Sequence, residues 1–399
     1  MSNAARKTVV LVGLLASLGA CTQRDAASRA PTAEPASTSD IDAASSVDAS
    51  DLKASPAGTP AAPVYRTFRD VVVACDNIRR CAAIGVNDSG SGLVLSLTRD
   101  AGADGAQALL LRAPWSDLDA SALRLDAVAA PAIAGLPWQR DAGESAALRI
   151  EEPAAIARFL DLARDGTRLG VDQDRSVSLS GFNAALLYID AHQQRLDTPS
   201  AWTRRGERDD AGVPAAPDLP VLARPASTPP ALSEADATRL TRSVRASQSA
   251  ALRAQACNAS GGEFDVARQD AAYPLDADHA LVFVTCYSGA YQASSLVFRA
   301  ARDGSDVTRL TLPAPKLSDD SEAREDFDLL VSPDFDPATG TLAQYAKGRG
   351  IGDCGYQANW QFDGEVFLLS HYAEMQRCGG LTADAWPVLW RVAESADAP

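Results

Sequence analysis

Seven cysteines are the residues of this 399-residue chain with the clearest chemistry, and the first of them stands apart from the rest. Cys21 ends an apolar run and follows Leu18-Gly19-Ala20, a segment that resembles a lipobox. Small residues mark the cleavage site of an exported chain, and a lipobox cysteine is acylated before it becomes the new N-terminus. The sequence therefore predicts that Cys21 carries palmitate-type acyl chains. An ordinary signal peptide that happens to contain a cysteine is the alternative.

The six remaining cysteines predict disulfides. They are even in number in a chain that is predicted to be exported, where thiols are oxidised. Nearest neighbours are the favoured partners because each such pair falls within one predicted domain, although other connectivities are open. No CxxC spacing or histidine cluster suggests a metal site, so we predict no metal ligand, and no thiol remains as a nucleophile. The predicted pairs are Cys75 with Cys81, Cys257 with Cys286, and Cys354 with Cys378.

The most unusual stretch runs from Lys347 to Gly355 and holds four glycines. A phosphate cradle would need a helix after the glycines, whereas the Trp360 hairpin follows here, so a nucleotide site is not supported. A bent loop pinned by the Cys354 disulfide and a loop that binds carboxylate or phosphate both remain open. In the first case Arg349 would pair with Asp353. The candidate binding residues are Lys347, Gly348, Arg349, Gly350, Gly352 and Asp353.

No catalytic residue can be assigned from the sequence. The three histidines are His192, expected on the exposed side of a helix, His279, expected in a turn, and His371, and none lies in a recognisable nucleophile motif. The acidic run at 319–328 predicts a solvated loop, because Ala338 breaks the calcium pattern that could follow it. Paired carboxylates for glycoside chemistry stay open, since sequence does not measure their separation.

A short leader and a tether precede the elements that must position these residues. Arg6 and Lys7 precede an apolar stretch from Val9 to Leu18, which is shorter than the roughly 20 residues that span a bilayer. We predict a signal peptide at 1–20 and a disordered tether at 21–63, because residues 22–63 contain no aromatic side chain to bury. Thr22 in place of Asp favours anchoring in the outer membrane, facing the periplasm.

Beyond the tether, the pattern predicts an α+β fold of two β-rich domains with a few helices. The first covers 64–205, with strands followed by helices, and the second covers 232–393, with a helix capped by Ser233 followed by strands. A Pro- and Ala-rich linker at 206–231 separates them, and a tail follows at 394–399. The predicted strands are 71–74, 93–98, 108–112, 123–127, 147–150, 177–179, 280–285, 294–299, 308–312 and 341–346; the predicted helices start at Pro153 and after Ser180, and a hairpin turns at Asp363-Gly364.

The charge excludes one class of partner. Lys and Arg number 37 against 52 Asp and Glu, and the formal net charge is −15. A chain this acidic is unsuited to nucleic acid and to electrostatic binding of anionic lipid. The membrane is therefore predicted to be reached through the lipid on Cys21.

Several motifs together resemble an exported bacterial family that is catalogued as the domain of unknown function numbered 1176. The resemblance covers about 65–391, and the opening strand with its cysteines also distantly resembles the invasion-associated locus B family. Neither family implies a catalytic residue or a cofactor. The motifs are Phe68-x-x-Val71, Cys75-Asp76-Asn77 with Cys81, Leu179-Ser180-Gly181 with Ile189-Asp190 and Gln193, Cys286 to Tyr291, Lys347 to Gly355, and Trp386 to Arg391.

The function predicted from these observations is a non-enzymatic envelope module that binds a protein, a glycan or a small ligand. A disulfide-stapled β-rich chain without a catalytic motif suits a binding surface. Two alternatives remain. A pocket of titrating carboxylates would favour a hydrolase of envelope polymers, and a protruding rigid loop would favour an inhibitor of cell-wall hydrolases.

Overall fold

The computed structural model describes residues 60–393 except 88, 91, 142–145, 258–265 and 319–324. The described residues all fall within one compact unit. The leader, Cys21, the tail and most of the tether therefore lie outside the described residues. Within the described part of the chain, no helix has the length and apolarity needed to cross a bilayer.

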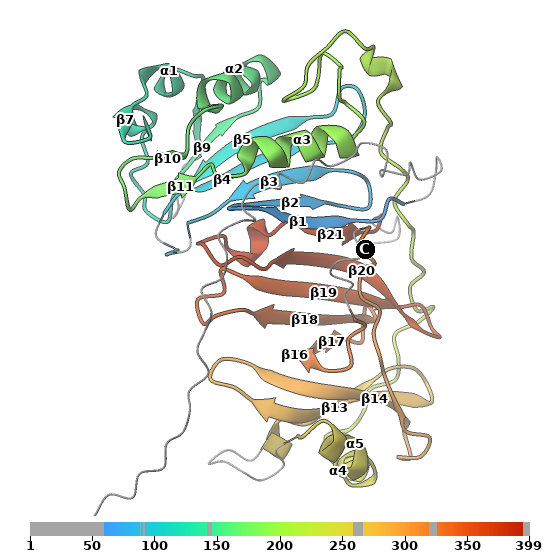
Figure 1. Cartoon of the computed structure of the whole chain (residues 1–399). Helices are drawn as coiled ribbons and strands as arrows, with labels where there is room; N and C mark the ends of the chain where they lie inside the picture. The colour runs from blue at the N-terminus through green and yellow to red at the C-terminus, as the bar shows by residue number, and fades with distance from the viewer. Residues whose placement is uncertain are drawn as a thin grey trace, which may run out of the picture. The chain divides into compact units, whose positions relative to one another are not determined.

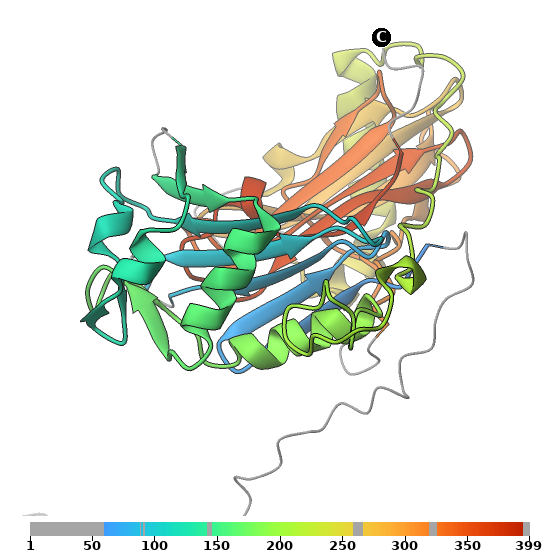
Figure 2. The same cartoon turned by 90° about the horizontal axis from the view of Figure 1, so that it is seen from above.

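The first sheet has seven antiparallel strands, and runs such as Val71-Val72-Val73 supply the β-branched side chains that favour them. Helices lie over one face of this sheet (Figure 1), and from above the green helices cross the blue and cyan strands (Figure 2). The strands are, in sheet order, β1 (Val64–Phe68), β2 (Val71–Cys75), β3 (Cys81–Gly85), β4 (Val94–Arg99), β5 (Gln107–Arg112), β9 (Ala147–Ile150) and β8 (Gln139–Asp141); the helices are α1 (Pro131–Ala134), α2 (Pro153–Ala163) and α3 (Phe182–His192).

Two predictions fail in the region of a small four-stranded sheet and helix α3. The single strand predicted at 123–127 is a tight hairpin, because Asp126 and Ala127 adopt φ of 51° and 67° and reverse the chain. The cap expected from Ser180 is also wrong. Gly181 is the N-cap of α3 instead, at φ 90°, and an added Cβ there would lie 1.9 Å from the carbonyl oxygen of Phe68. The strands are β11 (Ser176–Ser178), β10 (Arg168–Gly170), β6 (Arg124–Leu125) and β7 (Val128–Ala129).

Two further sheets are built from the second half of the chain. Ser233 caps α4 as predicted, since its hydroxyl oxygen accepts a hydrogen bond of 3.1 Å from the backbone N–H of Asp236. One sheet holds β17 (Asp334–Asp336), β18 (Thr341–Lys347), β19 (Gly355–Phe362), β20 (Phe367–Met375) and β21 (Val388–Arg391). The other holds β12 (Ala271–Pro274), β13 (His279–Ser288), β14 (Ala293–Ala301), β15 (Thr308–Arg309) and β16 (Leu330–Val331), beside α4 (Glu234–Ser247) and α5 (Ser249–Ala254).

The turn at Asp363-Gly364 differs from the expected two-residue type. Phe362 pairs with Phe367, so the loop has four residues, and only Gly364 of the expected pair adopts positive φ, at 109°. The Asp363 carboxylate accepts the backbone N–H groups of Glu365 and Val366, both at 2.8 Å. This side-chain capping stabilises a longer loop than the Asp-Gly pair by itself predicts.

The predicted division into two domains is not confirmed, because strand β2 contributes to two cores. Val71 and Val73 pack toward the helices, whereas Val72 and Ala74 pack with Trp360 and other residues of the second half. The predicted linker also lies against the rest of the chain. The N–H of Gly102 donates to the carbonyl oxygen of Pro214 at 2.9 Å, and that of Ala393 donates to the carbonyl oxygen of Pro220 at 2.8 Å.

Asn77 ties the first sheet to the last strand. Its side-chain oxygen accepts the N–H of Arg391 at 3.0 Å, and its amide nitrogen donates to the carbonyl oxygen of Arg391 at 2.9 Å. The same residue also donates its backbone N–H to the carbonyl oxygen of Leu389 at 3.2 Å. Through these three hydrogen bonds, two from its side chain and one from its backbone, Asn77 joins the two halves of the chain at this edge.

Candidate functional site

The glycine-rich loop joins β18 to β19 and is closed at its base. Lys347 pairs with Gly355 in the sheet register, and the N–H of Gly348 donates to the carbonyl oxygen of Cys354 at 2.7 Å. Gly352 and Gly355 adopt φ of 69° and 138°, a conformation that other residues rarely adopt. The Cys354–Cys378 disulfide ties the loop to the segment after β20, and the other two predicted disulfides also form.

The two cations of this loop have different surroundings. Arg349 makes a bidentate pair with Asp353, with Nε donating to Oδ1 at 2.6 Å and a second nitrogen to Oδ2. Asp353 Oδ2 also accepts the Gly380 N–H at 2.7 Å. Hydrogen bonding by Arg349 lowers the pKa of the nearly buried Asp353 carboxyl. Arg349 therefore braces the loop. This is the first of the two alternatives, the bent loop in which Arg349 pairs with Asp353, and it leaves Arg349 engaged within the loop.

Replacement of Arg349 by Ala is expected to lower the free energy of unfolding by about 1–2 kcal/mol at pH 7, since a charged hydrogen-bond pair is lost. A carboxyl whose folded pKa is lowered contributes stability above its unfolded pKa of about 3.9, and loses that contribution as pH falls through the folded value. The difference between wild type and variant should thus shrink at pH 3. Urea unfolding at both pH values measures it. An equal difference at both pH values would contradict the brace. Arg175→Ala is the control: its pair with Asp172 is exposed, so this variant should lower the free energy of unfolding far less.

Lys347 is the cation that remains at the surface. Its backbone N–H donates to the side-chain oxygen of Gln292 at 2.7 Å, and its Nζ lies 5.7 Å from the ring centre of Tyr345. Gln292 in turn donates from its amide to Ser332 at 3.1 Å and to the carbonyl oxygen of Tyr345. The side chain of Gln292 therefore holds the β13–β14 turn against the start of the loop.

Two large apolar side chains are exposed where this turn meets the loop. Ile351 is 74% exposed and Tyr291 is 75% exposed. The two residues lie in one region because the Tyr291 ring packs on Gly350, the residue before Ile351. A Cβ added to Gly350 would lie 2.9 Å from the ring Cζ. We call Lys347, Ile351 and Tyr291 the loop surface. Neither apolar residue of this surface was among the binding candidates predicted from the sequence, although Tyr291 ends the Cys286–Tyr291 motif.

A cleft of about 390 Å³ lies between β2–β4 and the segment from Ala385 to Arg391. Asp76 and Arg391 pair within it, with Nε 2.8 Å from Oδ2, and burial raises the pKa of the Asp76 carboxyl. Asp76 also accepts the backbone N–H groups of Ile78 and Arg80 through its other oxygen. One paired carboxylate that caps its own loop does not supply the acid and base of a hydrolase.

The other candidates for catalysis are dispersed. His279 lies at the start of β13 with Nδ1 2.9 Å from Asp276 Oδ1, and across the described residues no serine hydroxyl hydrogen-bonds a histidine ring. In the acidic run, Asp319, Asp320 and Glu322 lie outside the described residues. Asp326 and Asp328 accept hydrogen bonds from Ala314 N–H at 3.0 Å and the Thr311 hydroxyl at 2.6 Å. These two carboxylates join the segment at 326–328 to the antiparallel segment at 311–314.

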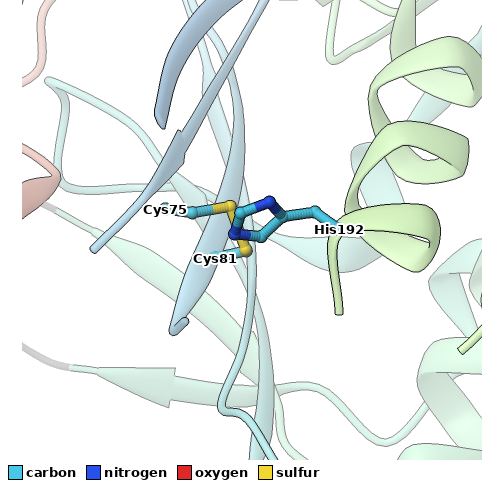
Figure 3. A group of neighbouring side chains, drawn as sticks. All are labelled: Cys75, Cys81 and His192. Carbon is cyan, nitrogen blue, oxygen red and sulfur yellow. A yellow bond between two sulfur atoms is a disulfide. The ribbon is translucent and has the colours of Figure 1, made fainter. Parts of the chain in front are cut away.

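His192 departs from its predicted exposed position. Its imidazole points at the Cys75–Cys81 disulfide, which joins paired residues of β2 and β3 (Figure 3). Its Nε2 is buried without a hydrogen-bond partner, and burial lowers the pKa of the ring to about 4. The expectation failed because α3 presents its last residue to the sheet, which the apolar spacing of the helix did not reveal.

Comparison with known proteins gives a family and no activity. The model of a protein family of unknown function, DUF1176, matches residues 65–393. An uncharacterized protein of Escherichia coli (strain K12), YpfG, is 33% identical over 344 residues, which cover 83% of this chain and 93% of the relative. No solved structure matches the chain. The resemblance to the invasion-associated locus B family stays a prediction.

Proposed function

Because the chain belongs to the DUF1176 family, whose function is unknown, we propose a function from its surface: it is a non-enzymatic binding protein of the cell envelope. It recognises a partner protein through the loop surface of Lys347, Ile351 and Tyr291. Cys21 is its lipid anchor and holds it at the outer membrane, facing the periplasm.

The observation that carries this proposal is a pinned loop with an apolar tip. The Cys354–Cys378 disulfide and the Arg349–Asp353 pair fix the loop before any partner arrives. A surface that is already ordered loses less conformational freedom on binding. Ile351 and Tyr291 are exposed on it, and exposed apolar side chains grouped in one place are typical of interaction sites.

A protein partner fits this surface better than a small anion. The Arg349 guanidinium is bound to the Asp353 carboxylate. Lys347 and Arg349 therefore do not present two available cations to a phosphate or carboxylate ligand. Tyr side chains are enriched among the residues that dominate protein–protein binding energies. Ile351 adds exposed apolar area next to Gly350, on which the Tyr291 ring packs. Lys347 at the edge favours a partner segment with an acidic residue.

The test places a photoactivatable phenylalanine analogue at position 351 in the full-length protein in cells. We expect a cross-linked species with one envelope protein, and Tyr291→Ser should reduce its yield about tenfold, because loss of a central aromatic contact costs more than 1 kcal/mol. The yield is measured by mass spectrometry of the purified adduct against total protein.

The matched control carries the same analogue at Val366, an exposed apolar residue in the turn at the other end of β19. Cross-linking at 366 with the same partner and yield would mean contact with any exposed apolar residue, and the proposal would be abandoned. An unchanged yield in Tyr291→Ser would remove that residue from the loop surface.

The exposed tip also favours a second candidate, an inhibitor of cell-wall hydrolases. A pinned loop with one apolar side chain at its apex has the form in which a loop fills an active-site cleft. The identity of the cross-linked partner separates the two: a hydrolase cross-linked from its active-site cleft supports inhibition, and any other envelope protein supports a binding module.

A further inference from the structure

We propose that Cys75, Cys81 and His192 form a zinc site when the disulfide between the two cysteines is reduced. The two sulfur atoms and a ring nitrogen of His192 lie within 4.8 Å of one another. Cys75 and Cys81 face each other on β2 and β3, and His192 comes from the end of α3 (Figure 3). The proposal is independent of the loop surface and of any partner that binds there.

The buried nitrogen of His192 is the observation that points to a missing ligand. Its Nε2 has no hydrogen-bond partner, although buried polar groups are nearly always satisfied. The adjacent disulfide sulfurs accept hydrogen bonds only weakly, so they do not replace water for this nitrogen. In the reduced protein the same nitrogen would coordinate an ion together with two thiolates.

The donor set fits zinc in particular. Zinc binds thiolate sulfur at about 2.3 Å and imidazole nitrogen at about 2.0 Å, and often uses three protein ligands with water as the fourth. Two thiolates and one neutral imidazole leave no net charge once the dication is bound, which suits a site where both cysteines are fully buried. A set without a carboxylate disfavours magnesium and calcium.

Reduction is the step that creates the site. A dithiol supplies two electrons and two protons, the bond between the Cys75 and Cys81 sulfurs breaks, two thiols form, and the dithiol becomes a cyclic disulfide. Zinc then displaces one proton from each thiol, and both protons pass to solvent. The reverse sequence needs a disulfide as oxidant: solvent returns one proton to each thiolate as the zinc leaves, and the two thiols then pass two electrons and two protons to that disulfide, which becomes a dithiol while the bond between the strands forms again.

The test uses the full chain with a phosphine reductant, which with one water supplies the same two electrons and two protons. Cobalt is the probe, because Co²⁺ bound by thiolates gives a sulfur-to-metal charge-transfer band, and zinc is then added to displace it. We expect this band, and its loss when zinc displaces the cobalt, in the reduced wild type, and neither in the oxidised protein.

His192→Ala is the decisive variant because the other reduced cysteines remain as binding sites, including Cys354 and Cys378 beside Asp353. It should weaken zinc binding about 100-fold, since one of three ligands is lost. His371→Ala, which removes a half-buried histidine far along the chain, should leave the affinity unchanged. Equal affinity in His192→Ala and wild type would overturn the proposal.

A second measurement covers the case in which reduction unfolds the chain. Alkylation of the reduced protein is mapped by mass spectrometry with and without one equivalent of zinc. We expect zinc to protect Cys75 and Cys81 in the wild type and not in His192→Ala. Absence of protection in the wild type would overturn the site, whether or not the reduced chain stays folded.

Discussion

Replacement of Arg99 by Leu is expected to lower the free energy of unfolding by about 4 kcal/mol, because it leaves a buried carboxylate without its partner. Arg99 in β4 and Asp190 in α3 have fully buried side chains, and the guanidinium donates to Asp190 Oδ1 at 2.7 Å. It also donates to the Gln193 side chain at 2.7 Å and to the carbonyl oxygen of Ser200 at 3.0 Å. The carboxylate would keep its bonds to backbone N–H groups but lose its countercharge.

The same guanidinium lies 3.8 Å from the ring centre of Trp202, so its removal also leaves a space beside the indole. Burial lowers the pKa of Arg99 to about 10, so the side chain stays charged at neutral pH. The arginine thus joins the first sheet to α3 and to the segment after it through one ionised group.

Urea unfolding of Arg99→Leu at pH 7 measures this effect. Arg80→Leu is the matched control, because Arg80 pairs with Asp100 at 2.6 Å but both side chains are exposed, and such pairs contribute at most about 1 kcal/mol. Adding Asp190→Leu to Arg99→Leu should recover part of the loss, since no unpaired charge remains. Similar losses in the Arg99 and Arg80 variants would contradict the role of burial.

Replacement of Cys21 by Ala is expected to abolish lipidation of the proposed anchor completely, because the acyl chain has no other thiol at the end of the leader. The variant should incorporate no labelled palmitate and should leave the membrane pellet for the soluble envelope fraction. Its six other cysteines are paired in disulfides and do not offer a substitute.

Thr22→Ala is the control for this prediction, since it alters the neighbouring residue and keeps the thiol. It should be labelled and sedimented like the wild type. Label that persists in Cys21→Ala would disprove the anchor. A wild type that takes up no label would support the alternative, an ordinary signal peptide that happens to contain a cysteine.

Local patterns predicted much of the fold. The strand predicted at 147–150 coincides with β9, and Ser233 caps α4 as the spacing to Asp236 indicated. The nearest-neighbour disulfides are confirmed because each pair joins segments that are close in sequence. These features depend on backbone propensity, side-chain capping and short separations, all of which are encoded in a few consecutive residues.

Features that depend on distant residues could not be predicted in this way. Asn77 and Arg391 are 314 positions apart, and nothing in the composition of 206–231 reveals that the sheets on either side share a core. The loop surface likewise depends on residues far apart in the sequence. The glycines identified the loop, but Tyr291 contacts it from the turn between β13 and β14. His192 likewise meets Cys75 and Cys81 only after α3 packs on the sheet.

The division of β2 between two cores has a consequence for how the molecule reaches its native state. A chain emerges N-terminus first during synthesis, so the first sheet can close on α2 and α3 while the surface of Val72, Ala74 and Ile84 still lacks its cover. That cover includes Trp360 and Leu389, near the end of the chain. Until the end of the chain arrives, this side of the first sheet exposes apolar side chains, so completion of the second core depends on contacts that span most of the polypeptide.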